Sequence, residues 1–170
     1  MSSTEIWVNN DGLEVLFGSE QGASALGGHV QSYGAFLETV LDIQGTLVPT
    51  ADAPVDKKVV IPPGAYIESA TFIVDTAFTS GGSATLDLGL MNDDGDGTYS
   101  TLDDNGIDAA LAVASLVADA RVACNGAQVN TSPANSADAT LPTVFSYGYN
   151  TAAFTAGRGR LIIKWRPTVT

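Results

Sequence analysis

The acidic segment from Asn92 to Asp103 contains the residue types in this chain best suited to chemistry. It reads NDDGDGTYSTLD, with carboxylate and amide side chains at alternate positions before a glycine. Oxygen ligands in this spacing are what Ca²⁺ requires, and loops of the D-x-[DN]-x-[DN]-G type supply them. The ligand positions would fall on Asn92, Asp94, Asp96, Ser100 and Asp103.

Two features of this segment weigh against calcium. Its last position is Asp103 rather than the longer Glu that usually binds Ca²⁺ through both oxygens. The residues before Asn92 have a strand pattern, which excludes an EF-hand because that motif requires a preceding helix. Asn, Asp and Gly also form turns without any metal. We therefore expect weak calcium binding or none, and we expect no other cofactor.

A second candidate is the basic segment near the C-terminus. Apolar residues alternate there with basic ones, so the two kinds fall on opposite faces of a strand. The basic face could be neutralised by the protein's own acids, or it could dock on an acidic neighbour. We expect an interface formed by this face and by an N-terminal tryptophan. Its residues are Trp7, Arg158, Arg160, Lys164 and Arg166.

Catalytic motifs are not apparent in the sequence. It has no G-x-S-x-G, P-loop or Gly-rich dinucleotide motif. His29 and Cys124 are the single histidine and cysteine, so neither a His-pair metal site nor an intrachain disulfide can form. Nineteen acidic residues leave a two-carboxylate glycosidase open. Because no aromatic cluster accompanies a pair of acids, we expect that the protein is not an enzyme.

The net charge of −12 and the pI of about 4.1 restrict the partners of the protein. Binding to nucleic acid requires clustered Lys and Arg, and anionic membranes also attract basic segments. We therefore expect neither partner. The N-terminus has no basic region followed by an apolar run, and no apolar stretch is long enough to span a bilayer. We expect a protein that is made in the cytoplasm and stays there or is packaged from there.

The fold class follows from alternating hydrophobic residues between Val59 and Asn92. One expected strand places Ala70, Phe72, Val74, Thr76 and Phe78 on its inner face. After a Gly-Gly-Ser turn, three leucines alternate in the same way. Alternation bounded by Gly and Pro is typical of antiparallel strands with one buried face. The sequence predicts an all-β protein, an antiparallel β-sandwich of jelly-roll-like form.

The rest of the chain completes this organisation. Glu5 to Phe17 is expected to form a hairpin around Asp-Gly, followed by a Gly-rich arm. The predicted domains are therefore an N-terminal hairpin and arm over residues 1–34 and one sandwich over residues 35–170. Ala and Leu are frequent between residues 103 and 120, with apolar residues three to four apart, so we expect one inserted helix near 105–119. The last two strands are expected over Leu141–Asn150 and Gly159–Arg166, with a turn near Ala156.

Three blocks of the chain, in order, resemble small virion-associated proteins of tailed phages. They are IWVNNDGLEVLFG, IPPGAYIESATFIVDTAFTSGGSATLDLGL, and NGIDAALAVASL followed by VACNGAQV. The resemblance implies a β-rich capsid decoration (cement) protein or a related head or tail component. No catalytic residue is carried over with it.

This resemblance leads to specific expectations. We expect a homotrimer on the capsid exterior, made in the host cytoplasm, that bridges adjacent subunits of the major capsid protein. The N-terminal hairpin and residues 18–34 would be the arm that reaches a neighbour. The alternative is a carbohydrate- or receptor-binding module on a tail or fibre. Exposed aromatics beside a calcium loop would favour that alternative, whereas a trimer at capsid three-fold positions would favour decoration.

Overall fold

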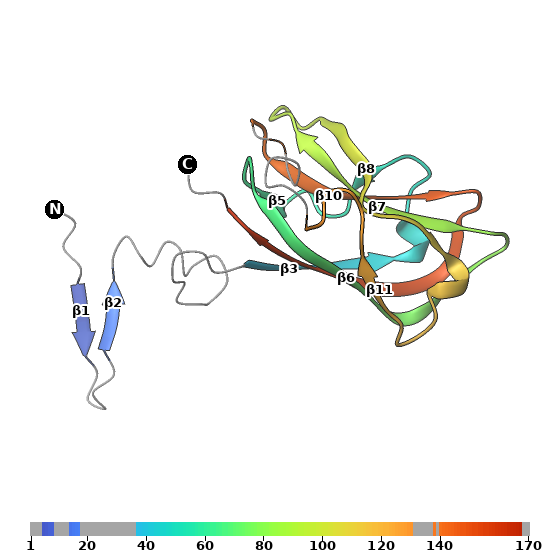
Figure 1. Cartoon of the computed structure of the whole chain (residues 1–170), viewed down its shortest axis with the longest axis horizontal. Helices are drawn as coiled ribbons and strands as arrows, with labels where there is room; N and C mark the ends of the chain where they lie inside the picture. Colours follow the sequence, from blue (N-terminus) through green and yellow to red (C-terminus); the bar gives the residue numbers. More distant parts are fainter. Residues whose placement is uncertain (1–4, 9–13, 18–36, 131–137, 139, 168–170) are drawn as a thin grey trace. The chain divides into compact units, whose positions relative to one another are not determined.

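The computed structural model describes residues 5–8, 14–17, 37–130, 138 and 140–167 (Figure 1). These residues divide into an N-terminal unit ending at Leu37 and a second unit that starts at Glu38. In the first unit, β1 (Glu5–Val8) pairs with β2 (Glu14–Phe17) in an antiparallel hairpin. The predicted hairpin is therefore confirmed. Its connecting turn and the predicted arm over 18–34 lie outside the described residues.

The second unit contains two antiparallel sheets. The strands of the first sheet, in spatial order, are β3 (Leu37–Gln44), β11 (Phe154–Arg166), β6 (Tyr66–Ser80) and β9 (Arg121–Cys124). Those of the second are β4 (Ala53–Pro54), β10 (Thr143–Asn150), β7 (Thr85–Asp93) and β8 (Tyr99–Ala112). The short strand β5 (Val60–Ile61) also pairs with β10. The 3-10 turns η1 (Gly45–Leu47) and η2 (Val113–Ser115) follow β3 and β8.

The pairing of these strands is nested. β3 pairs with β11, β4 with β10, β6 with β9, and β7 with β8. The first long strand of the sandwich is thus beside the last. Along the chain, each of these pairs encloses the pair that follows it in this list. An eight-stranded double sheet connected in this way is a jelly roll. The predicted all-β antiparallel sandwich, including its jelly-roll form, is confirmed.

Alternation along β6 and β7 produces the core between the two sheets. Ala70, Phe72, Val74 and Phe78 are buried as predicted, because successive side chains of a strand point to opposite faces. Thr76 is exposed instead, at a point where the β6–β11 register shifts. Fully burying one large apolar side chain contributes roughly 1.5–3 kcal/mol, so this core supplies the main stabilisation. The largest side chains with less than 2% exposure include Phe72, Phe145, Ile43, Leu86, Leu88, Leu90 and Leu161.

The predicted helix near 105–119 is wrong. Residues 99–112 form β8, and the described residues 113–119 contain only the short turn η2. Ile107 and Leu111 are buried, but by strand pairing with β7. Leu86 lies opposite Leu111 and Leu88 opposite Asp108, so β8 has extra residues at register shifts. These bulges turn the period-two spacing into one of about four residues, which resembles a helix.

The expected turn near Ala156 is also wrong. Ala156 lies within β11, opposite Thr79, and β11 already begins at Phe154. The β10–β11 connection comes earlier, where Thr151 has a positive φ of 75°. Gly157, with φ of 125°, lies at the register shift between Ala156 and Arg158, so the glycine marks an irregularity within the strand rather than its end.

No helix among the described residues has the length and apolar character needed to cross a membrane.

Candidate interaction face

The strand β11 positions the predicted basic residues on the outer side of the first sheet. Its buried residues include Leu161, Ile163 and Trp165, which face the core. Trp165 Nε1 donates a hydrogen bond of 2.9 Å to Thr39 Oγ1 on β3, which fixes that edge strand against β11. The remaining residues of β11 and their neighbours form a surface that we call the β11 face. Its members are Arg158, Arg160, Ile162, Lys164 and Arg166 on β11, Glu38, Val40 and Asp42 on β3, Thr71, Ile73 and Asp75 on β6, and Arg121 and Ala123 on β9.

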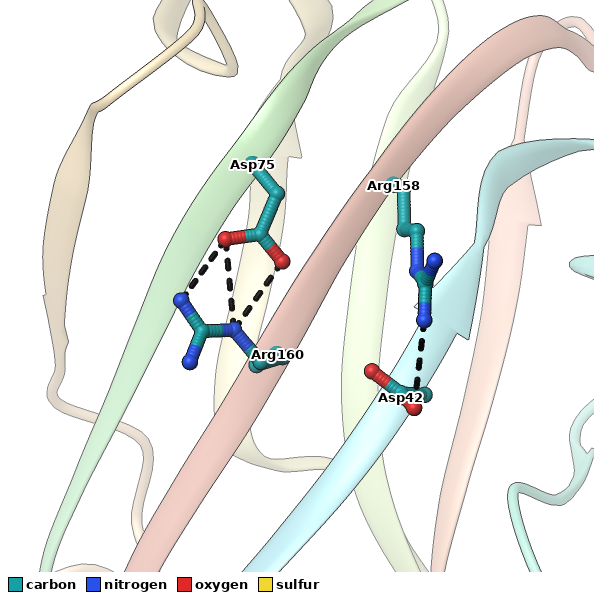
Figure 2. Close-up of polar contacts among 4 residues, drawn as sticks. All are labelled: Asp42, Asp75, Arg158 and Arg160. Carbon is teal, nitrogen blue, oxygen red and sulfur yellow. Dashed lines mark hydrogen bonds and ion pairs between the residues drawn. The ribbon is translucent and has the colours of Figure 1, made fainter.

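Arg160 forms the stronger of the two ion pairs found among the described residues. Its Nη2 lies 2.7 Å from Asp75 Oδ1, and its Nε lies 3.0 Å from Asp75 Oδ2 (Figure 2). Two parallel N–H donors therefore bind one carboxylate, a geometry that suits the planar guanidinium. The hydrogen bonds from Arg160 lower the pKa of Asp75, and those to Asp75 raise the pKa of Arg160.

Arg158 pairs with the strand on the other side of β11. Its Nη2 lies 3.4 Å from Asp42 Oδ2 on β3, and both side chains are more than half exposed. Exposed pairs of this kind contribute about 0–1 kcal/mol. Figure 2 shows the two pairs on adjacent strands, reaching from β11 to β6 and to β3. Arg158 and Arg160 thus fit the interpretation in which the protein's own acids neutralise the basic face.

The other predicted interface residues behave differently. Lys164 is exposed and forms no ion pair with any residue that the structure describes. The guanidinium carbon of Arg166 lies 5.0 Å from the centre of the Tyr66 ring, a cation–π contact that partly covers this aromatic side chain. Trp7 lies opposite Val15 in the hairpin. Its role at an interface stays a prediction.

The predicted calcium ligands lie around the β7–β8 turn. Asn92 and Ser100 are opposite each other on the two strands. Ser100 Oγ donates to Asp94 Oδ1 over 3.0 Å, and the Thr98 backbone N–H donates to Asp96 Oδ1 over 2.9 Å. These hydrogen bonds close the turn. The Thr98 hydroxyl also donates to Asp96 Oδ1, and this hydrogen bond is the main cause of the lowered pKa of Asp96.

Asp103 contacts a different part of the chain from the other predicted ligands. Its Oδ2 accepts a hydrogen bond of 3.0 Å from Gln128 Nε2. Asn92 Nδ2 donates to Asp138 Oδ2 over 3.3 Å, so this amide also has a different partner. Within the described residues, no three His, Cys, Asp or Glu side chains are grouped so that they could hold a metal ion. Weak calcium binding or none stays our prediction for the segment.

A group of acids on the second sheet was missed by the sequence analysis. Burial, together with the nearby charges of Asp104 and Asp87, raises the pKa of Asp52 to about 6. Asp87 also accepts hydrogen bonds from the Ala110 backbone N–H and from Asn150. These acids are far apart in the sequence, and no local motif connects them. Only the strand pairing brings them together.

Comparison with known proteins places the fold among phage capsid structures. No protein-family model and no curated protein matches the chain. A chain in the capsid of Ralstonia phage GP4 is similar in structure, with a TM-score of 0.52 and 20% identity, over 82% of this chain and 89% of that one. A chain in the capsid asymmetric unit of cyanophage Pam1 has a TM-score of 0.48 and 14% identity, over 79% of this chain and 88% of that one. The jelly roll described above is therefore a fold shared with a phage capsid chain.

Proposed function

We propose that this protein is a structural protein of a tailed-phage virion and that it decorates the capsid. The observation that carries the proposal is the nested jelly roll, which matches a chain of the Ralstonia phage GP4 capsid over 82% of this chain. The resemblance of three sequence blocks to tailed-phage virion proteins agrees with this match. The two arguments differ in kind, because one uses local sequence and the other the path of the whole backbone.

The proposed mechanism is mechanical. A homotrimer sits on the capsid exterior and bridges adjacent subunits of the major capsid protein. Surface buried across several subunits is lost whenever the shell opens locally, so binding raises the free energy of that opening. The jelly roll suits this task because its two sheets provide broad faces, and its first strand, β3, is paired with its last, β11.

The number of copies per virion tests this proposal. Decoration of a shell requires hundreds of copies, which quantitative mass spectrometry of purified particles would measure against the major capsid protein. Purified protein should also bind heads that lack it and raise the temperature at which they release DNA. Tens of copies or fewer would contradict decoration and would fit the alternative, a carbohydrate- or receptor-binding module of a tail or fibre.

A further inference from the structure

The two sheets of the sandwich differ in formal charge. The strands β4, β5, β7, β8 and β10 contain five aspartates and no lysine or arginine. The strands β3, β6, β9 and β11 contain five of the protein's seven basic residues and four acids, so their formal charge is +1 (5 − 4), compared with −5 on the other sheet. A strongly acidic protein has thus placed most of its positive charge on one sheet. Such an arrangement steers the association of unlike faces.

Two cations on the β11 face have no acidic partner among the described residues. Lys164 lies opposite Ser69 and Arg121 lies opposite Ile73, both across β6. Both cations are exposed, and neither is part of the two ion pairs found there. Four residues along β6 and two strand spacings separate them, which places their backbones about 16 Å apart. Arg158 and Arg160 are already neutralised, so these two cations are the part of the face that can attract an acidic partner.

The surface between the two cations has little charge. Ile162, Thr71 and Ala123 lie side by side in register on β11, β6 and β9. Ala123 is exposed and the other two are half-buried, while Val40 on the edge strand β3 is 50% exposed. An apolar centre with charged residues around it is the usual arrangement of a protein–protein interface. The β11 face therefore has both a contact area and a charge pattern that selects its partner.

The acidic counterpart is present on the same chain. Asp94 and Asp96 are exposed at the β7–β8 turn, and neither forms an ion pair within the part of the chain that the structure describes. We propose that the β11 face of one copy binds the β7–β8 turn of a second copy. The contact is head-to-tail, because it joins two different surfaces, and repeated contacts of this kind close into a ring when the rotation permits. The inference rests on the homo-oligomer of the proposed function and names the two surfaces that form it.

Charge reversal in two variants tests this contact. Lys164→Glu plus Arg121→Glu alters the face, and Asp94→Lys plus Asp96→Lys alters the turn. Each variant alone should self-associate about tenfold or more weakly than the wild type, because like charges then meet. Mixed together, the two should associate again, since each supplies the surface that complements the other. Sedimentation equilibrium measures this, and circular dichroism verifies folding.

A matched control carries the same change of net charge. Lys57→Glu plus Lys58→Glu reverses two exposed cations outside the β11 face. Lys57 lies over the Tyr99 ring beside the β7–β8 turn, so this change makes the acidic surface more negative and should leave association unweakened. The inference is overturned if the wild type stays monomeric, if either test variant associates normally, or if the mixture of folded variants does not associate. Because these measurements use the isolated chain, they can fail while the protein still decorates heads, and the copy number per virion decides that question separately.

Discussion

Asp52 lies against Gly148 so closely that a Cβ atom added to this glycine would be 2.6 Å from Asp52 Oδ1. Gly148 is buried on β10, so the Asp52 carboxylate packs on bare backbone and loses part of its hydration. This burial, with the charges of Asp104 and Asp87, raises the pKa of Asp52 to about 6. Between about pH 4 and pH 6 the folded protein therefore holds a proton at Asp52 that the unfolded chain has already released.

The first prediction concerns the pH dependence of stability. Because the folded pKa of Asp52 is raised, its contribution to the free energy of unfolding is favourable at low pH and is lost as pH rises from about 4 to above 6. Asp52→Asn should stabilise the protein by about 1 kcal/mol at pH 7.5, a value reduced for the partial exposure of this group. At pH 4 the effect should largely vanish. Urea denaturation at both pH values measures it.

The control for this prediction is Glu38→Gln. Glu38 is an exposed acid on β3, in the other sheet, and its change should have little effect at either pH. Equal effects of Asp52→Asn at pH 4 and pH 7.5 would contradict the proposed cause, because they would show that the Asp52 charge is not what destabilises the fold.

The second prediction concerns Gly89 on β7. A Cβ atom there would lie 2.4 Å from the carbonyl oxygens of Asp103 and Asp104, which are backbone atoms of β8 and cannot move aside cheaply. Gly89→Ala should therefore destabilise the protein by about 2–3 kcal/mol, measured by urea denaturation. Gly81→Ala is the matched control, since nothing lies within 4 Å of its Cβ position, and it should change stability by less than about 1 kcal/mol. Similar changes in the free energy of unfolding for both variants would contradict the prediction, because they would show that the β8 backbone moves away to accommodate the methyl group.

The strands that the sequence predicts well are those with regular alternation. Phe72 and Val74 on β6 and the leucines of β7 follow a period of two, and a local pattern of this kind is sufficient to identify a half-buried strand. β8 could not be found in this way. Its bulges place Ile107 and Leu111 four residues apart, and the high helix propensity of its alanines supports the wrong interpretation. Pairing with β7 overrides both.

The same distinction applies to the candidate site. Alternation along β11 predicts that Arg158, Arg160 and Lys164 share a face, and this is confirmed by their exposure. Which acids they meet depends on strand order and register, since Asp42 comes from β3 and Asp75 from β6. Neither order nor register can be read from the local sequence. The contact between Asp52 and Gly148 was unpredictable for the same reason, because nearly a hundred residues separate them.

The third prediction concerns calcium. The carboxylates of Asp94 and Asp96 accept hydrogen bonds from their own turn, while Asp103 binds Gln128, so the side chains do not converge on one point. We expect the melting temperature to be unchanged by millimolar Ca²⁺ or by a chelator. A rise with Ca²⁺ that is lost in Asp94→Ala plus Asp96→Ala would contradict this expectation and would identify the turn as a calcium site.

The last prediction concerns the N-terminal segment. A two-stranded hairpin is marginally stable alone, so β1 and β2, with four residues each, need another surface for support. We expect the sandwich to keep its fold without this segment, because β3 begins only at Leu37 and is held to β11 by the hydrogen bond between Trp165 and Thr39. Deleting residues 1–34 should therefore leave the melting temperature within a few degrees of the full chain but abolish binding to heads, measured by co-sedimentation. Trp7→Ala in the full chain should weaken binding in the same direction, and normal decoration by the truncated protein would show that the segment is not the arm.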